Sequence, residues 1–320
     1  DCGTNTFNLL VKEKVEGKWK TLFKTKLPVK LGTGGFSENL LMPARMARGI
    51  DALYSYRNVI DSLEVKDVRV FATSAVREAS NRKDFVTRVK KHLNFDMEVI
   101  SGDREAELIF EGVVQTTQEI KEDYLIMDIG GGSTEFIFVR DQKPLWRKSY
   151  LLGVSRIHGM LNPASRINQD DVNRLRGHLN KELLDLISFL KENPVRVLVG
   201  SSGSFDTLFD MYQFGGAKDS PKDASQDSAK GFTERSTESS TEGSRKLNEI
   251  PFNAYPSIHQ WLMGSTLEER LKHPSIPQMR AEYMPLSTYL LKFVLEQSNF
   301  NKIYQSEYAL KEGVLAHYLN

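Results

Sequence analysis

Two hydrophobic periods alternate along the first part of the chain, one typical of strands and one typical of helices. Phe7, Leu9 and Val11 alternate with more polar positions, which predicts a strand, and Glu16-Gly17 suits a hairpin turn after it. A helical period then begins, with Ser37 as the expected N-cap. The other elements predicted here are strands at 68–72 and 97–100 and helices at 37–63, 83–93 and 103–118.

The second part opens with two strands that flank a run of glycines between Tyr124 and Val139. Ser265 and Glu268 have the spacing of a capping box, which predicts a helix start there. The elements expected around them are strands at 145–151, 195–199 and 302–304 and helices at 169–192, 257–263, 266–272, 279–297 and 310–319. This alternation of strands and helices predicts an α/β protein.

One segment, 215–245, interrupts this pattern. It is rich in Ser, Thr and charged residues and poor in apolar ones. Such a composition favours a mobile surface insertion, because the segment has little apolar surface to bury. A loop that grips phosphate or a partner is the alternative interpretation.

The composition is that of a soluble globular protein, with 40% hydrophobic and 27% charged residues. A formal net charge of +1 provides no global field for nucleic acid or anionic lipid, so we expect neither as a partner. No apolar run is long enough to span a bilayer. Cys2 is the single cysteine, which rules out an intrachain disulfide and fits the cytoplasm. The first residue is Asp rather than Met, and it starts inside a predicted strand, so we expect residues to precede it.

The stretch DIGGGSTEFIFV, which begins at Asp128, carries an acid into a turn almost without side chains. A plain hairpin needs only one or two glycines, and three cost conformational entropy on folding. Bare backbone N–H groups in such a turn bind anions, and Ser and Thr hydroxyls add donors. A carboxylate beside a phosphate needs a cation between them, which makes Asp128 a candidate ligand of Mg²⁺.

The start of the chain, DCGTNTF, has the same design: Asp1, an apolar residue, glycine, small polar residues and an exiting strand. Repetition at this scale predicts two related lobes, 1–121 and 122–320, with the two loops facing each other and Asp1 as a second metal candidate. The alternative is a pair of glycine-rich hairpins, each with an Asp that caps its turn. A third turn, GSSGSFD from Gly200, ends a strand and opens a helix, and is either an anion site or a simple helix cap.

Two further side chains are candidates for the chemistry. Glu105, with Glu107, follows a strand and opens a helix, where a carboxylate either acts as a general base on water or only complements the helix dipole. Arg77 occupies a similar place and either clamps phosphate or pairs with Glu78. P-loop, dinucleotide-binding and nucleophile-elbow motifs are absent from the sequence, and its histidines lack metal-ligand spacing.

Six segments resemble, in sequence and in order, the exopolyphosphatase and guanosine pentaphosphate phosphohydrolase (Ppx/GppA) family of the sugar kinase, Hsp70 and actin superfamily. They are DCGTNTFNLLV, ATSAVREA, EVISGDREAELIFEGV, LIMDIGGGSTEFIFV, GSSGSFD and YALKEGVL. The resemblance implies two ribonuclease-H-like lobes around a central cleft, with the final helix packing back on the first lobe. It also implies Mg²⁺-dependent removal of the terminal phosphate from inorganic polyphosphate or from guanosine pentaphosphate (pppGpp).

By position, the resemblance implies that Glu105 is the catalytic base and that Asp128 binds metal. It also implies that Arg280, in MRAEYMP, approaches the substrate. The phosphate-binding positions that it implies are Thr4, Asn5, Thr6, Arg77, Gly130, Gly131, Gly132, Ser133 and Glu135.

The chain departs from the family pattern beside the base, where Arg104 and Glu107 replace an acid and an arginine. It also ends after the second lobe, without the C-terminal helical domains that extend the polyphosphate path in longer members. Three alternatives therefore stay open: a pppGpp phosphohydrolase, a sugar-kinase-like phosphotransferase and a non-catalytic polyphosphate or alarmone sensor. A homodimer is one of the assembly states that the sequence leaves open.

Overall fold

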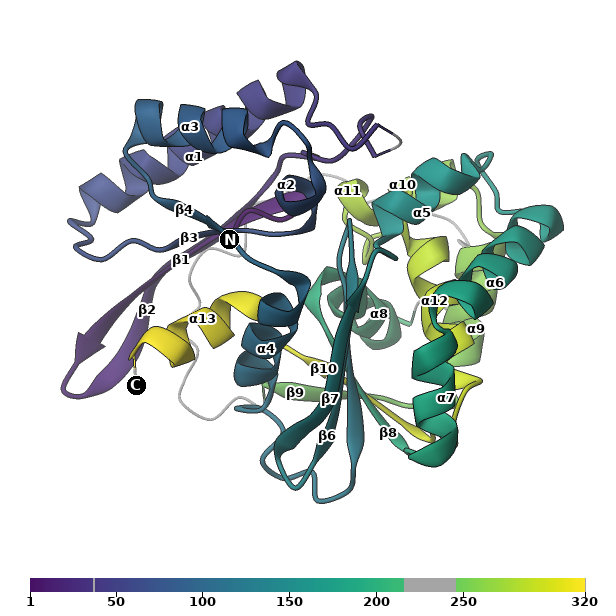
Figure 1. Cartoon of the computed structure of the whole chain (residues 1–320). Coiled ribbons are helices and arrows are strands. Elements are labelled where there is room, and N and C mark those ends of the chain that lie inside the picture. Colours follow the sequence, from purple (N-terminus) through teal and green to yellow (C-terminus); the bar gives the residue numbers. More distant parts are fainter. Residues whose placement is uncertain (37, 216–245, 320) are drawn as a thin grey trace, which may run out of the picture.

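The computed structural model describes residues 1–36, 38–215 and 246–319, and a mixed sheet with the order β7-β6-β5-β8-β10-β9 occupies its larger part (Figure 1). β5, β6 and β7 form an antiparallel meander, β8 and β10 run parallel to β5, and β9 pairs antiparallel at the edge. This order is that of the expected ribonuclease-H-like lobe. The bounds are β5 (Tyr124–Ile129), β6 (Thr134–Arg140), β7 (Lys143–Tyr150), β8 (Val197–Ser201), β9 (Leu247–Ile250) and β10 (Lys302–Ser306).

A smaller set of strands forms the first lobe. β1 (Thr6–Val15) and β2 (Lys18–Pro28) make an antiparallel hairpin, and the positive φ angles of Glu16 (51°) and Gly17 (80°) confirm the predicted two-residue turn. β3 (Val70–Ala72) and β4 (Met97–Val99) run parallel. Buried Cys2 bridges Phe7 of β1 and Ala72 of β3, and so joins the two pairs.

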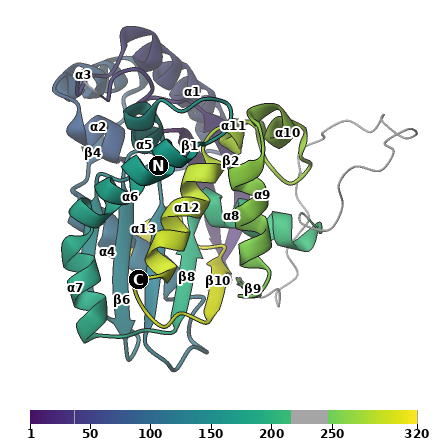
Figure 2. The same cartoon turned by 90° about the vertical axis from the view of Figure 1, so that its right-hand side faces the viewer.

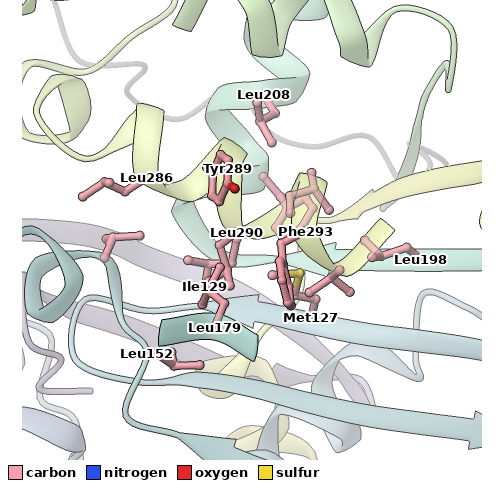
Figure 3. Close-up of a cluster of buried hydrophobic side chains, with 14 of the residues drawn as sticks. Met127, Ile129, Leu152, Leu179, Leu198, Leu208, Leu286, Tyr289, Leu290 and Phe293 are labelled. Atoms are coloured by element: carbon pink, nitrogen blue, oxygen red, sulfur yellow. The ribbon is translucent and has the colours of Figure 1, made fainter. Parts of the chain in front are cut away.

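Both faces of the larger sheet are buried, because alternate residues of its strands enter different cores. Leu125, Met127 and Ile129 of β5 pack on one side, whereas Tyr124 and Ile126 pack on the other. Figure 3 shows Met127 and Ile129 packed against side chains of α12 (Met284–Leu295). The sheet is thus a rigid base for the loop that leaves β5.

Helices cover both lobes. α1 (Pro43–Ser62), α2 (Ser74–Glu78) and α3 (Arg82–Leu93) pack on the first lobe. Figure 2 shows α6, α7, α9 and α12 in front of the larger sheet. The bounds of the other helices on the second lobe are α5 (Val154–Leu161), α6 (Gln169–Glu182), α7 (Leu184–Glu192), α8 (Ser202–Gln213), α9 (Tyr255–Gly264), α10 (Leu267–Lys272) and α11 (Gln278–Ala281).

Two helices cross between the lobes in close contact. α4 (Gly102–Val113) packs on β6 and β7, and α13 (Leu310–Leu319) lies against α4 (Figure 1). Glycines make the crossing this close: a Cβ on Gly313 would lie 1.6 Å from the Leu108 carbonyl oxygen, and one on Gly112 2.2 Å from that of Ala309. The division of the chain after residue 121 stays a prediction, since α4 contacts both parts.

Several predicted boundaries are wrong. The first helix begins at Pro43 after Met42, and the N-cap prediction at residue 37 lies outside the described residues. The capping box uses Thr266 and Glu269, one residue beyond the predicted pair. The expected helix at 169–192 is interrupted at Leu183, between α6 and α7.

Most of the predicted insertion, 216–245, also lies outside the described residues. No helix in the described part of the chain is long and apolar enough to cross a membrane.

Candidate active site

The glycine loop between β5 and β6 presents its peptide groups in two directions. The Gly130 N–H donates to the Ser133 carbonyl at 3.0 Å and closes the turn. The carbonyls of Gly130 and Gly131 accept from the first N–H groups of α5, at 3.0 and 2.9 Å. Within the described residues, the N–H groups of Gly131 and Gly132 donate to no protein acceptor. Two free amides at a turn are able to bind an anion, and the anion site that the sequence indicates stays a prediction.

The loop at the start of the chain lies directly against the glycine loop. A Cβ on Gly131 would be 2.8 Å from the Asn5 side-chain nitrogen, and one on Gly132 would be 2.6 Å from the Thr4 hydroxyl. The Ser155 hydroxyl donates to Asn5 Oδ1 at 2.9 Å, which ties α5 to the first loop. The two repeated motifs therefore meet, as expected. Thr6 begins β1, and its carbonyl accepts the Gly3 N–H at 3.0 Å, so its backbone supports the turn.

Ser74 is a candidate that sequence reasoning missed. It opens α2, its side chain is 1% exposed, and its hydroxyl has no hydrogen-bond partner within the described residues. A Cβ on Gly132 would lie 2.6 Å from this hydroxyl, so it faces the glycine loop. A buried polar group without a partner is costly and suggests an absent ligand. The small residues of ATSAVREA, which the sequence analysis used only for Arg77, were the available signal.

The two aspartates that begin the loops are both held by hydrogen bonds. Ser201 and Ser202 each donate to Oδ2 of buried Asp128 at 2.6 Å. Ser202 has a φ of 67°, a strained conformation for a residue with a Cβ and one that functional sites often contain. Asn8 donates to Oδ2 of Asp1 at 2.9 Å, while Oδ1 of Asp1 is buried without a partner.

Their carboxylate oxygens are hard ligands of the type that Mg²⁺ prefers. Within the described part of the chain, no three His, Cys, Asp or Glu residues are grouped closely enough to hold a metal by themselves. Mg²⁺ commonly uses only one or two carboxylates and completes its shell with water and substrate phosphate. Together with the orphaned oxygen of Asp1, this donor set fits the ion.

Glu105 lies in the first turn of α4, where Ser101 caps the helix by accepting from the Arg104 N–H at 3.1 Å. Its side chain is buried, and Arg77 donates to its Oε2 at 2.7 Å. Burial raises the pKa of Glu105 to about 6, with Arg77 opposing the shift and Asp128 adding to it. A carboxylate with this pKa is well suited to accept a proton near neutral pH.

Arg77 makes one of the two contacts that the sequence left open, the pair with Glu78, and its phosphate contact stays a prediction. It donates to Glu78 at 3.0 Å and to the Ile100 carbonyl at 3.2 Å, in addition to Glu105. Glu107, by contrast, pairs with Arg104 at 2.7 Å on the other side of the helix start and is 34% exposed. Of the two acids after the strand, only Glu105 is thus buried in the site.

Glu135 completes a group of three buried acids. Ser149 donates to its Oε1 at 2.7 Å, and its side chain is 1% exposed. Burial, together with the charges of Glu105 and Asp128, raises its pKa well above the usual value. Burial likewise raises the pKa of Asp128, against the opposing effect of its two serine donors. This concentration of negative charge favours the binding of a cation.

The third turn, which opens α8, lies on the far side of Asp128. A Cβ on Gly203 would be 2.1 Å from the guanidinium of Arg280 in α11. Arg280 donates to the Thr207 hydroxyl at 2.9 Å and lies 3.6 Å from Asp206. The weakly predicted Arg280 is therefore close to a glycine-rich turn, where a protein acid partly neutralises it.

Comparison with known proteins agrees with this geometry. Residues 10–320 match the model of a family described as the Ppx/GppA phosphatase family. The crystal structure of an exopolyphosphatase from Cytophaga hutchinsonii is 32% identical over 98% of this chain and 94% of its own, with a TM-score of 0.86. A Ppx/GppA family member from Aquifex aeolicus is 22% identical over 99% of this chain and 95% of its own, with a TM-score of 0.74, and supports the fold. The chain therefore belongs to the Ppx/GppA phosphatase family and is a phosphoanhydride hydrolase.

Proposed function

We propose that the protein is a Mg²⁺-dependent exopolyphosphatase, which releases the terminal phosphate of inorganic polyphosphate by in-line attack of water. Family membership supports a phosphatase that acts on polyphosphate or pppGpp. The observation that carries the proposal is that the glycine loop, with its two free amides, meets the loop at the start of the chain beside a buried carboxylate whose pKa is about 6. An anion-binding site and a general base are the two features that hydrolysis of a phosphoanhydride requires.

Each side chain has a defined task in this proposal. The amides of Gly131 and Gly132 and the hydroxyls of Thr4 and Ser74 hold the oxygens of the terminal phosphate. Glu105 orients the attacking water and accepts its proton as the new P–O bond forms. The bridging P–O bond breaks, and the shortened chain leaves with the electron pair.

Asp1 and Asp128 would hold Mg²⁺, which would supply positive charge to the phosphate oxygens. Arg77 orients Glu105 through the bond to Oε2 and adds positive charge beside the phosphate. Ser133 and Glu135 act behind the loop: Ser133 closes the turn, and Glu135 completes the buried acid group. In this proposal Glu135 has no direct contact with phosphate, because two anions repel each other.

A phosphate-release assay tests the proposal. The wild-type protein is given polyphosphate of defined lengths and pppGpp, each with Mg²⁺ and with a chelator. We expect Mg²⁺-dependent release from polyphosphate, and Glu105→Gln should lower kcat by about 100-fold or more, the usual size of a general-base contribution. Glu107→Gln is the matched control, since it removes an equivalent acid from the same helix outside the site.

Each result bears on a different part of the proposal. Turnover of pppGpp but not of polyphosphate would mean that the protein is a pppGpp phosphohydrolase. Equal loss of activity in Glu105→Gln and Glu107→Gln would remove Glu105 from the role of base. If phosphate release persisted after chelation of Mg²⁺, the activity would not depend on the metal.

A further inference from the structure

A row of lysines follows one face of the β1–β2 hairpin. Lys24 and Lys26 are two residues apart on β2, so both side chains lie on the same face. Lys24 is paired with Leu10, and Lys12 follows Leu10 by two residues on β1, which places Lys12 on that face as well. Phe7 and Val11 occupy the opposite face and are buried in the first lobe. The lysine row therefore points away from that core.

The row faces α13 and an open groove. Lys24 lies 3.8 Å from Glu312, in the first turn of α13, and is 54% exposed. The groove, of about 690 Å³, is lined by Lys12, Trp19, Lys246 and Tyr308 together with Glu111 and Glu312. The two acids have partners of their own, because Glu111 bonds His317 at 3.1 Å and Glu312 bonds Lys311 at 3.2 Å.

The row is continuous with the candidate active site. The pKa of Lys26 is lowered, first by desolvation and then by the charges of Arg280, Lys311 and Lys24, with Asp206 opposing. Lys311 is also near enough to Asp128 to lower the pKa of that carboxyl. Lys311, which contacts Glu312 at 3.2 Å, is thus within electrostatic range of both Lys26 on the hairpin and Asp128 in the candidate site.

Lys12, at the outer end of the row, also has a lowered pKa. Desolvation lowers the pKa of Lys12, the charges of Lys246 and Lys24 add to the effect, and Glu312 opposes it. Glu312 is a single carboxylate among several lysines, so positive charge remains that a further anion would neutralise. Lysine binds phosphate as a point charge and needs no fixed ligand shape, so the row suits a flexible linear polyanion.

We propose that the lysine row Lys12, Lys24 and Lys26, with Lys246 and Lys311, binds the internal phosphates of a long polyphosphate chain whose end occupies the active site. This inference rests on the proposed function and deepens it. It places the distal chain on the hairpin of the first lobe, within the residues present here. A triphosphate is too short to follow the row, so the row favours long polyphosphate over pppGpp.

The test compares lysines on the two faces of the hairpin. Lys12→Gln/Lys24→Gln removes two charges from the row. Lys20→Gln removes one from the other face, because the register shift between Val11 and Lys12 reverses the alternation of β2 and leaves Lys20 opposite Glu13. We expect the double variant to raise KM for long-chain polyphosphate by about tenfold, a modest effect because exposed charges contribute little each. KM for tripolyphosphate and for pppGpp should stay within twofold, and Lys20→Gln should behave as the wild-type protein.

Two further measurements keep the result interpretable. Lys12→Arg/Lys24→Arg retains the charges and should retain the wild-type KM, which separates charge from packing against α13. The salt dependence of KM for long chains should weaken in the glutamine variant, since exposed charges are screened by salt. An unchanged KM for long chains, or an equal rise for tripolyphosphate and pppGpp, would overturn the proposed row.

Binding to the Glu105→Gln variant separates this inference from the proposed function. Calorimetry with long-chain polyphosphate should show binding that the two glutamine substitutions weaken. If the wild-type protein releases no phosphate but this binding is seen, the row stands and the exopolyphosphatase proposal fails. If phosphate is released but the lysines do not affect binding, the exopolyphosphatase proposal stands and the row fails.

Discussion

At the scale of single residues, the candidate site is defined by buried acids of different character. Glu105 has a guanidinium partner, Asp128 has two serine donors, and Glu135 has serine donors with two anionic neighbours. The pKa of each carboxyl is raised because burial outweighs the partners that oppose it. These environments suggest different roles for three acids that the sequence alone presents as equivalent.

The pH dependence of activity follows from Glu105. A general base must be ionised, so kcat/KM should rise with pH around a midpoint of about 6. Arg77→Gln removes the charge that opposes the shift, so the midpoint should move to higher pH, whereas Arg77→Lys should move it less. A pH–rate profile of the three proteins measures this. A midpoint that does not respond to Arg77→Gln would mean that the profile reports another group.

The ionisation of Glu135 should make the protein less stable as pH rises, whereas the ionisation of Glu105 makes it more active. Its pKa is raised on folding, so the folded state holds the proton more tightly than the unfolded state above the usual pKa of 4.5. Stability at this residue is therefore lost as pH rises above 4.5.

Glu135→Gln keeps the shape without the ionisation, so the variant should melt at a higher temperature than the wild type at pH 7 and the difference should fade toward pH 4. Thermal unfolding at several pH values tests this. A difference in melting temperature that is the same at every pH would show that ionisation is not its cause.

At the scale of elements, the position of Glu105 depends on how α4 is fixed. The helix begins at Gly102, where a Cβ would lie 2.6 Å from that of Ser149, and it crosses α13 through Gly112 and Gly313. Glycine is the only residue that fits these approaches without movement of backbone. The base is thus held at one end of a helix whose other end is packed against the last helix of the chain.

Gly313→Ala should disrupt this crossing. The new methyl would meet the Leu108 carbonyl oxygen at 1.6 Å, so the helices must separate. We expect a loss of about 1–3 kcal/mol in the free energy of unfolding, the usual cost of overpacking. Gly177→Ala in α6 is the control, since a Cβ there meets nothing within 4 Å and should stabilise the protein by up to about 1 kcal/mol. Equal effects of the two substitutions in denaturant unfolding would contradict the role given to the crossing.

The parts of the site that were predictable are those in which unusual residues are neighbours in the sequence. The bare glycine loop and its echo at the start of the chain stand out because glycines, small polar residues and an acid occur together. Ser149 and Ser155 were not predictable, since their importance arises only when distant segments meet. Helix starts were misplaced for a similar reason: Thr266 and Ser265 are both good caps, and the choice between them depends on geometry.

At the scale of the whole molecule, the two lobes meet where their loops touch. A Cβ on Gly131 would lie 2.8 Å from the Asn5 side-chain nitrogen and 3.0 Å from Cβ of Thr4. The two lobes are therefore so close at this point that only glycine fits at position 131. The repeated motif and the family resemblance made the two-lobed fold predictable. The tightness of this contact was not predictable, because no local pattern of residues encodes it.

Gly131→Ala tests whether function depends on this approach of the lobes. The variant keeps the free amide of residue 131 but forces the loops apart, so kcat/KM for polyphosphate should fall by about 100-fold, the cost of an ångström-scale misplacement of catalytic groups. Asn5→Ala makes room for the new methyl. If the contact between the lobes is what matters, the double variant should recover part of the lost activity, although Asn5→Ala alone lowers it. Double-mutant analysis measures this coupling directly, and purely additive losses would show that the glycine is needed within its own loop and not for the meeting of the lobes.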